Sequence, residues 1–365
     1  MKKIVHICNN YVASKVHMEL ISSISKKGHE QRIFIPIRSR LHENINIIKN
    51  DNIEFKYFKY FDYLRFLPIL KIFTIFIGYL SFSGRSKQDY VIAHNFWTDG
   101  MVAYLNNIFF GVPFTLVIRN TDMNVFLPKL KHYHWLMKMM VEKSDGLIFI
   151  NKIYMKKFSE KYPIIFSKSK KNTLIFNGVN SFWLRFPEKK ERKNILIYVG
   201  GFNANKNIKS TLLASEIVLD KISDLELWLI GGSEQQFKEL LNLNEIPAHV
   251  KILGEVNNKE DLKSLYLQSK VFVMPSFYET FGLVYIEALL QGCSVICTKG
   301  QGIDGLFNSE FIKSVDPNNI NQIAFEIENL LLNFDSKIFD ENFYSDLIDS
   351  FDWNKISSKY LELIK

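Results

Sequence analysis

The sequence predicts an α/β protein built from two doubly wound parallel sheets. Three observations support this. Short apolar runs alternate with amphipathic helical stretches, the alternation restarts at Asn194, and a length of 365 residues suits two domains of ordinary size. A hydrophobic content of 47% favours folded domains over disorder. We expect a first domain over 1–186 and a second over 187–349, with a helix over about 350–365 packing back on the first.

The expected strands are short and rich in β-branched residues. They cover 4–8, 31–36, 90–93, 114–118 and 146–150 in the first domain, and 194–199, 225–230, 250–253, 271–274 and 294–298 in the second. The expected linker is the charged stretch 182–193, which contains Pro187. Open α/β sheets bind ligands beyond the carboxyl ends of their strands, so the loops after these strands are the places to look for chemistry.

The most informative of these loops follows the strand at 271–274. It places Glu279 in the loop and Glu287 in the first turns of the next helix, eight residues apart around Gly282. A carboxylate accepts charge-assisted hydrogen bonds from hydroxyl groups, so this pair suits a sugar or a ribose. The alternative is that both are solvated surface acids beside an ordinary strand-to-helix turn.

The start of the same helix suits an anion. The backbone N–H groups of Phe281, Gly282 and Leu283 precede or begin the helix, where unpaired donors and the helix dipole favour a group such as a diphosphate. The missing Cβ at Gly282 would let a ligand come close to the backbone.

These residues resemble the E-x7-E region of the retaining glycosyltransferases of family 4. The resemblance is good over roughly the last half of the chain and loose over the first half, and it continues at 177–179, 198–207, 229–232, 250–254, 287–298 and 351–356. It implies the GT-B fold, with two Rossmann-like domains facing across a cleft. It also implies transfer of a sugar from a nucleoside-diphosphate sugar to a hydroxyl group, with retained anomeric configuration.

The resemblance assigns roles in the second domain. Glu279 would hold hydroxyls of the donor sugar, Glu287 would hold the ribose, and Lys206 would neutralise the leaving diphosphate. The alternative for Lys206 is an ordinary surface lysine. The donor-binding residues implied by the resemblance are Phe281, Gly282, Leu283, Glu287, Gly200, Gly201 and Gly254. The family usually has arginine where this chain has Gly201, which leaves less positive charge for the diphosphate.

The first domain departs further from the family pattern. Ala13 and Ser14 replace a common glycine pair, and we hypothesise that Lys15, with Ser14 beside it, supplies part of the missing donor-binding charge. His94 matches a histidine frequent in the family and is a catalytic candidate, against the alternative of a core or surface histidine.

The next expected strand ends at another group of polar residues. Many relatives carry a His-Asp pair there; Asp122 agrees with that pattern, but Thr121 stands in the place of the histidine. We therefore expect Arg119 and Asp122 to hold acceptor hydroxyls, and Asp122 is also a catalytic candidate.

No metal ion or cofactor is expected. The sequence has no D-x-D pair of the kind that holds a metal-bound diphosphate, so we expect metal-independent transfer. The resemblance implies a nucleotide sugar as the substrate, and a UDP-sugar is the first choice. Cys8, Cys293 and Cys297 lie in apolar runs and indicate core thiols of a reducing cytoplasm. Metal binding at Cys293 and Cys297 is the alternative, but no histidine or second cysteine pair accompanies them.

Charge is unevenly distributed along the chain. Residues 1–186 hold 28 Lys and Arg against 12 Asp and Glu, whereas 187–365 hold 18 against 26, within a total of +8. The basic half favours an anionic partner. No nucleic-acid motif is visible, so an anionic membrane surface fits better.

Two stretches would face that membrane. Residues 65–82 are apolar over almost a membrane span, but Pro68 and Lys71 interrupt them, so we expect a helix that lies on lipid or packs inward. Residues 126–138 offer a second basic and aromatic face. Ordinary core helices with lysines at their edges are the alternative for both. We expect a cytoplasmic protein, peripheral on the inner face of the membrane, whose acceptor is a lipid-linked glycan of capsule, O-antigen or other cell-envelope polysaccharide.

Two other function classes remain open. A nucleotide-sugar epimerase of similar architecture would convert the donor alone into a new sugar. A catalytically idle nucleotide-sugar-binding partner of a second transferase is suggested by Gly201 and Thr121, and it would release no nucleotide.

Overall fold

The computed structural model describes residues 2–83, 88–188, 190–307, 309–334 and 341–364, without the side chain of Arg65. The chain divides into two compact units, Met1–Gly178 with Trp353–Lys365, and Val179–Asp352. The second unit begins before the expected linker at 182–193. Lys189 of that linker and Lys365 of the expected last helix lie outside the described residues.

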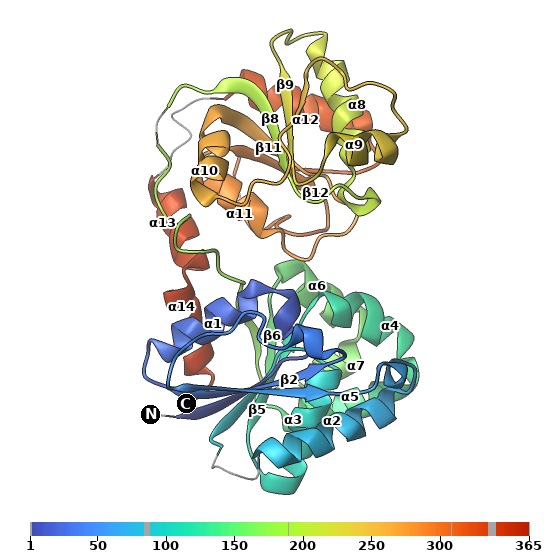
Figure 1. Ribbon diagram of the computed structural model, residues 1–365, viewed down its shortest axis with the longest axis vertical. Coiled ribbons are helices and arrows are strands. Elements are labelled where there is room, and N and C mark those ends of the chain that lie inside the picture. Colours follow the sequence, from blue (N-terminus) through green and yellow to red (C-terminus); the bar gives the residue numbers. More distant parts are fainter. Residues whose placement is uncertain (1, 84–87, 189, 308, 335–340, 365) are drawn as a thin grey trace. The chain divides into compact units, whose positions relative to one another are not determined.

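Within the described part of the first unit, seven parallel strands form a sheet in the order β3-β2-β1-β4-β5-β6-β7 (Figure 1). The strands are β1 (Lys3–Ile7), β2 (Glu30–Ile37), β3 (Ile53–Lys59), β4 (Tyr90–Ala93), β5 (Phe114–Ile118), β6 (Leu147–Phe149) and β7 (Asn172–Leu174). The helices are α1 (Lys15–Ser25), α2 (Pro68–Ser83), α3 (Thr98–Phe110), α4 (Leu127–Lys129), α5 (His134–Lys143), α6 (Lys152–Lys161), α7 (Pro163–Phe166) and α14 (Trp353–Glu362).

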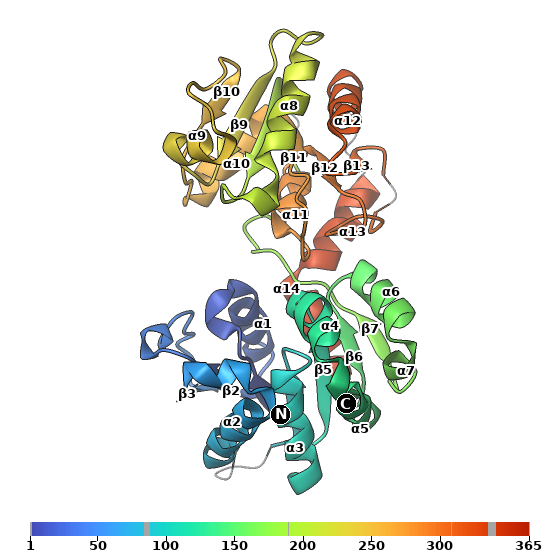
Figure 2. The ribbon, with the colours of Figure 1, turned by 90° about the vertical axis from the view of Figure 1, so that its right-hand side faces the viewer.

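Alternate residues along β1 pack on opposite faces of this sheet. Val5 and Ile7 join the core under α2, α3 and α5, whereas Ile4 joins the core under α1 and α14. Figure 2 shows α1 on one side of this sheet and α2 and α3 on the other. The last helix is tied to α1 because the Ser23 hydroxyl donates to the Trp353 carbonyl at 2.9 Å and bonds to Ser357 Oγ. The five strands expected in the first domain, whose following loops were expected to carry functional residues, are confirmed.

The described part of the second unit holds a six-stranded parallel sheet in the order β10-β9-β8-β11-β12-β13. The strands are β8 (Lys193–Val199), β9 (Glu226–Ile230), β10 (Val250–Ile252), β11 (Ser269–Val273), β12 (Ser294–Thr298) and β13 (Ile312–Val315). The helices are α8 (Ile208–Leu219), α9 (Glu234–Leu241), α10 (Lys259–Gln268), α11 (Leu283–Leu290), α12 (Ile320–Leu332) and α13 (Glu341–Phe351).

The expected linker is packed against the second unit. Trp183 is 2% exposed, with its ring 5.8 Å from that of Tyr266. Arg192 is buried, and its guanidinium donates to the carbonyls of Tyr266, Ser269 and Gln291. Because two of these carbonyls end or follow helices α10 and α11, the buried cation meets the negative ends of their dipoles. The charged stretch therefore anchors the start of β8.

All three cysteines are free and buried, which confirms the expected core thiols. Within the described ranges, no helix is both long enough and apolar enough to cross a membrane; α2 has 16 residues.

Candidate active site

The second sheet reverses its strand order between β8 and β11, and the loops that follow these two strands are bonded together. Asn205 donates from Nδ2 to the Tyr278 carbonyl at 2.9 Å and accepts from the Tyr278 N–H at 3.0 Å. The Phe277 N–H donates to the Asn205 carbonyl at 2.8 Å. Asn207 has a φ of 54° and donates to the Pro275 carbonyl at 3.1 Å. Such a switch point is where open α/β sheets bind ligands.

Sequence reasoning missed these two asparagines. Their signal was the repeat of asparagine at 203, 205 and 207 after a strand, because asparagine tolerates left-handed backbone and bonds to nearby main chain. Asn203 adds the third member: its side chain accepts from the Lys206 N–H at 3.3 Å and its Nδ2 donates to the Gly201 carbonyl at 3.2 Å. The loop therefore holds Lys206 from both sides.

The structure brings Lys206 and Glu279 together. Lys206 Nζ lies 2.6 Å from Glu279 Oε2, and the side chains are 23% and 11% exposed. The second carboxylate oxygen of Glu279 accepts from the Thr280 N–H at 3.1 Å. An ammonium group can bind a phosphate oxygen, and a carboxylate can accept a hydrogen bond from a sugar hydroxyl. A ligand that offers both groups could therefore replace the ion pair.

Gly282 is required here for two reasons. Its φ is +73°, and a Cβ would lie 2.3 Å from the Tyr285 ring and 3.1 Å from Glu279 Cγ. It precedes α11, which begins at Leu283 and has no side-chain cap at this end. Phe281 points into the core, 5.6 Å from the Phe351 ring, so only its backbone is placed to bind a ligand.

Glu287 lies in the second turn of α11 and is only partly exposed. Burial raises the pKa of this carboxyl to about 7, although Lys259 opposes the shift. Among the described residues, none donates a hydrogen bond to its carboxylate. The group is thus desolvated and has acceptor capacity to spare, which suits hydroxyl donors.

The other three glycines expected to bind the donor differ in their surroundings. A Cβ at Gly200 would lie 3.2 Å from Tyr198 Oη and 3.3 Å from Met274 Sδ, so the fit is tight. At Gly254, with a φ of +69°, and at Gly201 there is open space around the position. The nearest atom to a Cβ at Gly201 would be Asn203 Nδ2 at 3.7 Å, so packing does not exclude a larger side chain there.

The first unit brings its own candidates together where β4 and β5 end. Arg119 Nε donates to the His94 carbonyl at 2.9 Å, and the Arg119 N–H donates to Asp122 Oδ2 at 2.9 Å. Asp122 Oδ1 accepts from the Phe96 N–H at 3.1 Å. Burial raises the pKa of Asp122 to about 7 despite these bonds. His94 is 1% exposed and Asp122 is fully buried, so Arg119 is the partly exposed member.

The remaining two candidates lie at the start of α1. Ser14 is its N-cap and accepts from the Val16 N–H at 3.3 Å, and Lys15 is an exposed first residue. The helix start and the lysine together form a positive surface in the first unit. The expected catalytic, donor and acceptor roles of the residues in both units stay predictions.

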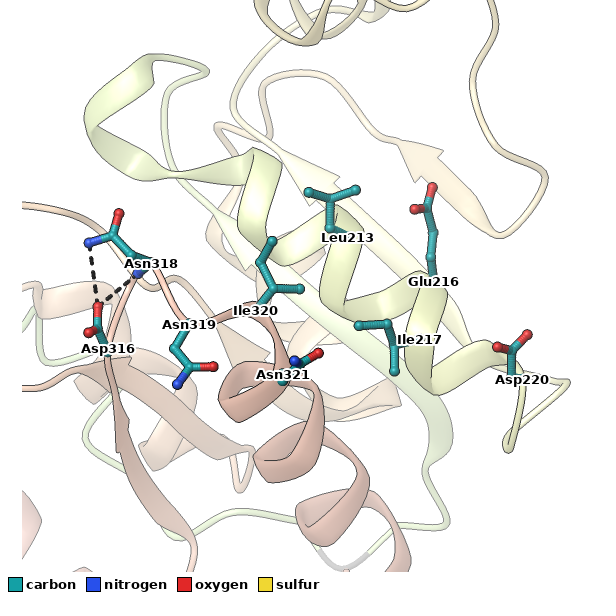
Figure 3. A pocket seen from close by; sticks show the side chains of 9 residues that line it. All are labelled: Leu213, Glu216, Ile217, Asp220, Asp316, Asn318, Asn319, Ile320 and Asn321. Atoms are coloured by element: carbon teal, nitrogen blue, oxygen red, sulfur yellow. Dashed lines mark hydrogen bonds between the residues drawn. The ribbon is translucent and has the colours of Figure 1, made fainter.

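A groove of about 940 Å³ lies elsewhere in the second unit, between α8 and the start of α12 (Figure 3). Its lining includes Glu216, Asp220 and Asp316, and among its described residues there is no lysine or arginine. In Figure 3, Asp316 accepts hydrogen bonds from Asn318, at 2.9 and 3.4 Å. This acidic lining would repel a diphosphate, so we place the candidate site at Lys206 and Glu279 instead.

Sequence comparisons identify relatives of this chain. Residues 180–343 match the family described as "Glycosyl transferases group 1". An uncharacterized glycosyltransferase of Methanocaldococcus jannaschii is 23% identical over 78% of this chain and 77% of that protein. "O-antigen chain mannosyltransferase B" of Escherichia coli is 29% identical over 36% of this chain and 35% of that protein. "O-antigen chain mannosyltransferase RfbU" of Salmonella typhimurium is 27% identical over 47% and 46%. The chain matches less than half the length of either mannosyltransferase.

Solved structures share the fold over almost their whole length. A sucrose-phosphate synthase from Thermosynechococcus elongatus has a TM-score of 0.73 at 19% identity, covering 100% of this chain and 98% of that one. A trehalose-6-phosphate protein of E. coli bound with UDP-2-fluoro glucose has a TM-score of 0.72 at 12% identity, covering 100% and 99%. At these identities the likeness concerns the fold. The chain therefore has the GT-B fold of two Rossmann-like domains, and residues 180–343 of its second domain match the glycosyl transferases group 1 family.

Proposed function

We propose that the chain is a retaining glycosyltransferase that moves a sugar from a nucleoside-diphosphate sugar, preferably a UDP-sugar, to a hydroxyl of a lipid-linked glycan. The observation that carries this proposal is the Lys206–Glu279 pair at the switch point of the second sheet. The names of the two O-antigen relatives support a role in cell-envelope polysaccharide synthesis. UDP-2-fluoro glucose in a structural neighbour supports the UDP-sugar.

Donor binding would exchange the partners of this ion pair. The diphosphate draws the Lys206 ammonium away from the carboxylate, and the released Glu279 oxygen then accepts a bond from a sugar hydroxyl. When the bond to the leaving oxygen breaks, negative charge grows on the diphosphate, and Lys206 stabilises it most strongly at that moment. The backbone donors at the start of α11 add to this stabilisation.

The acceptor's proton needs no separate protein base in this scheme. In a front-face reaction the acceptor hydroxyl approaches on the side from which the diphosphate departs, so a leaving phosphate oxygen takes its proton. Both oxygens of Asp122 already accept backbone hydrogen bonds. This scheme uses no metal ion at the diphosphate and no cofactor.

Removing either member of the ion pair should slow transfer while leaving the domain folded. We expect Glu279→Gln and Lys206→Ala each to lower kcat/KM by about 10²–10³, as for the loss of one charge-stabilising group in a transition state. Nucleotide release from a panel of activated sugars, with and without a lipid-linked acceptor, measures the effect.

Glu260→Gln and Lys209→Ala are matched controls, because both residues are exposed on helices of the same domain. Unchanged turnover in the Glu279 and Lys206 variants would contradict the proposed site. A new sugar formed from donor alone would favour the epimerase, and a wild-type chain that releases no nucleotide from any donor would favour the idle partner.

The pKa of Glu287 predicts a pH-dependent donor affinity. Ribose hydroxyls that donate to this carboxylate favour its ionised form, so binding should lower its pKa from about 7. Affinity for UDP-glucose should then rise with pH up to about pH 8, by at most about tenfold per unit, and level off above. Calorimetric titration between about pH 6 and 8 measures this, since the diphosphate diester itself does not titrate there.

Glu287→Gln is the matched variant, because it keeps the shape but cannot ionise. It should bind UDP-glucose more weakly at about pH 8 and with a flat pH profile. A wild-type profile that is as flat as that of the variant would show that the Glu287 carboxylate does not meet the nucleotide.

The first unit has a surface suited to a peripheral membrane contact. The outer side of α2 exposes Ile69, Leu70, Phe73 and Ile77, and the end of α3 exposes Ile108, Phe109 and Phe110. We call this set the α2–α3 apolar face. The two helices are neighbours, because the Phe76 and Phe109 rings stack at 5.7 Å. Apolar side chains on a domain with strongly positive charge match an anionic bilayer surface, whose attraction would add to apolar burial.

Flotation with vesicles containing anionic lipid tests this contact. The wild-type chain should float at low salt and be released as ionic strength rises from about 0.05 to about 0.5 M. Phe73→Ser with Ile77→Ser should reduce the floating fraction severalfold. Phe325→Ser, a change at an exposed phenylalanine of the second unit, should have no effect. No flotation of the wild-type chain at low salt would refute the membrane contact.

A further inference from the structure

A buried group of metal-ligating side chains lies in the first unit, whereas the Lys206–Glu279 pair belongs to the second. Cys8 follows β1, His17 lies on α1 and His94 follows β4, and each is at most 2% exposed. One ligand atom from each lies within 4.8 Å of the others. We call these residues the Cys8 cluster. β1 and β4 are where the first sheet reverses its strand order, the place where open sheets bind ligands.

A chain of hydrogen bonds fixes the protonation of His94. Gln31 Nε2 donates to the Ile21 carbonyl, so Gln31 Oε1 must accept from His6 Nε2 at 3.0 Å. The ring proton of His6 therefore sits on Nε2, and its Nδ1 is an acceptor. The 2.9 Å bond between His6 Nδ1 and His94 Nε2 is then donated by His94. His94 Nδ1 is left with a lone pair.

That lone pair has no partner. His94 Nδ1 is buried without a hydrogen bond, and so is His17 Nδ1 in the neighbouring ring, whose centroid is 5.0 Å away. Both rings are buried, an environment that favours the neutral imidazole to which a metal ion binds. A metal-ligating histidine usually donates its other ring N–H to a neighbour, as His94 does to His6.

A buried carboxyl group lies near the Cys8 cluster. Asp99 is fully buried and interacts electrostatically with Cys8. Both of its carboxylate oxygens lie 3.2 Å from the Asn9 N–H, and among the described residues no lysine or arginine forms an ion pair with it. Lys71 and Arg119 act on Asp99 at longer range, and Arg119 also acts on Cys8 and on both histidines. The Cys8 thiolate formed on binding would offset one charge of a divalent cation.

We infer that Cys8, His17 and His94 form a binding site for a divalent cation of the zinc type inside the first domain. Two imidazole nitrogens and one sulfur are ligands that zinc prefers, with a fourth position left for water or another donor. Zinc bonds of about 2.0–2.3 Å require the three ligand atoms to draw together by about 1 Å. On binding, the Cys8 thiol loses its proton to solvent and the histidines lose none.

A metal ion at this site would link three segments: the loop that follows β1, helix α1, and the end of β4. It would make His94 a ligand and not a general base, which agrees with a transfer in which the leaving phosphate takes the proton. The inference does not rest on the proposed function, because the Lys206–Glu279 pair that carries that function belongs to the second domain.

Cobalt(II) is the most direct probe, since a cobalt–thiolate bond gives a charge-transfer absorption in the near ultraviolet. Reduced, metal-stripped wild-type chain should bind one Co²⁺ with this absorption, and Zn²⁺ should displace it and raise Tm. Cys8→Ser should abolish the absorption, and His17→Gln should weaken Co²⁺ binding at least tenfold. Cys297→Ser is the matched control, because it changes a buried cysteine outside the cluster and should leave the spectrum intact.

If a variant fails to fold, the cobalt spectrum and the Tm of the wild-type chain alone test the inference. A wild-type spectrum without cobalt–thiolate absorption, together with a Tm that Zn²⁺ does not change, would overturn the inference. So would an absorption that persists in Cys8→Ser. Nucleotide release by the second-domain site is a separate measurement, so failure of one proposal does not imply failure of the other.

Discussion

The ion pair between Lys206 and Glu279 is the interaction on which the account of this protein depends. It joins the two loops that leave the second sheet on either side of its switch point, and the asparagines at 205 and 207 fix both loops so that the pair can form. In the absence of donor, the Lys206 ammonium group and the Glu279 carboxylate bind each other and are largely shielded from water. In the proposed reaction, a diphosphate and a sugar hydroxyl would offer the same two groups better-matched partners, so the pair would serve both as a structural contact and as a binding site.

The two domains use the same sheet architecture for different chemistry. At the switch point of the second sheet the loops present an ammonium group and a carboxylate, which we propose bind a nucleotide sugar. At the switch point of the first sheet lie buried histidines, a buried thiol and buried acids, with the partly exposed Arg119 beside them. The histidines and the thiol are the groups that we infer bind a cation. The first half of the chain also carries an excess of basic residues, and α2 and α3 expose apolar side chains in the same unit.

Much of this could be predicted from the sequence, and the failures have physical causes. Ten strands were expected from apolar runs, but β3, β7 and β13 were missed. These three strands lie at sheet edges. In the half-exposed strand Ile53–Lys59, apolar residues alternate with polar ones, and the other two strands are only a few residues long. The E-x7-E spacing located Glu279 and Glu287. It could not show that Glu279 pairs with Lys206, or that burial moves the pKa of Glu287, because both depend on loops distant in sequence. Likewise, Cys8, His17 and His94 are spread over 87 positions and meet only through β1, α1 and β4.

The central claim is that the Lys206–Glu279 pair opens to receive the donor. A crystal structure of the chain with a non-transferable UDP-sugar analogue tests this most directly. The account predicts Lys206 Nζ within hydrogen-bonding distance of a diphosphate oxygen, and Glu279 accepting a bond from a hydroxyl of the sugar. A complex in which the ion pair remains closed and the nucleotide lies against other residues would contradict it.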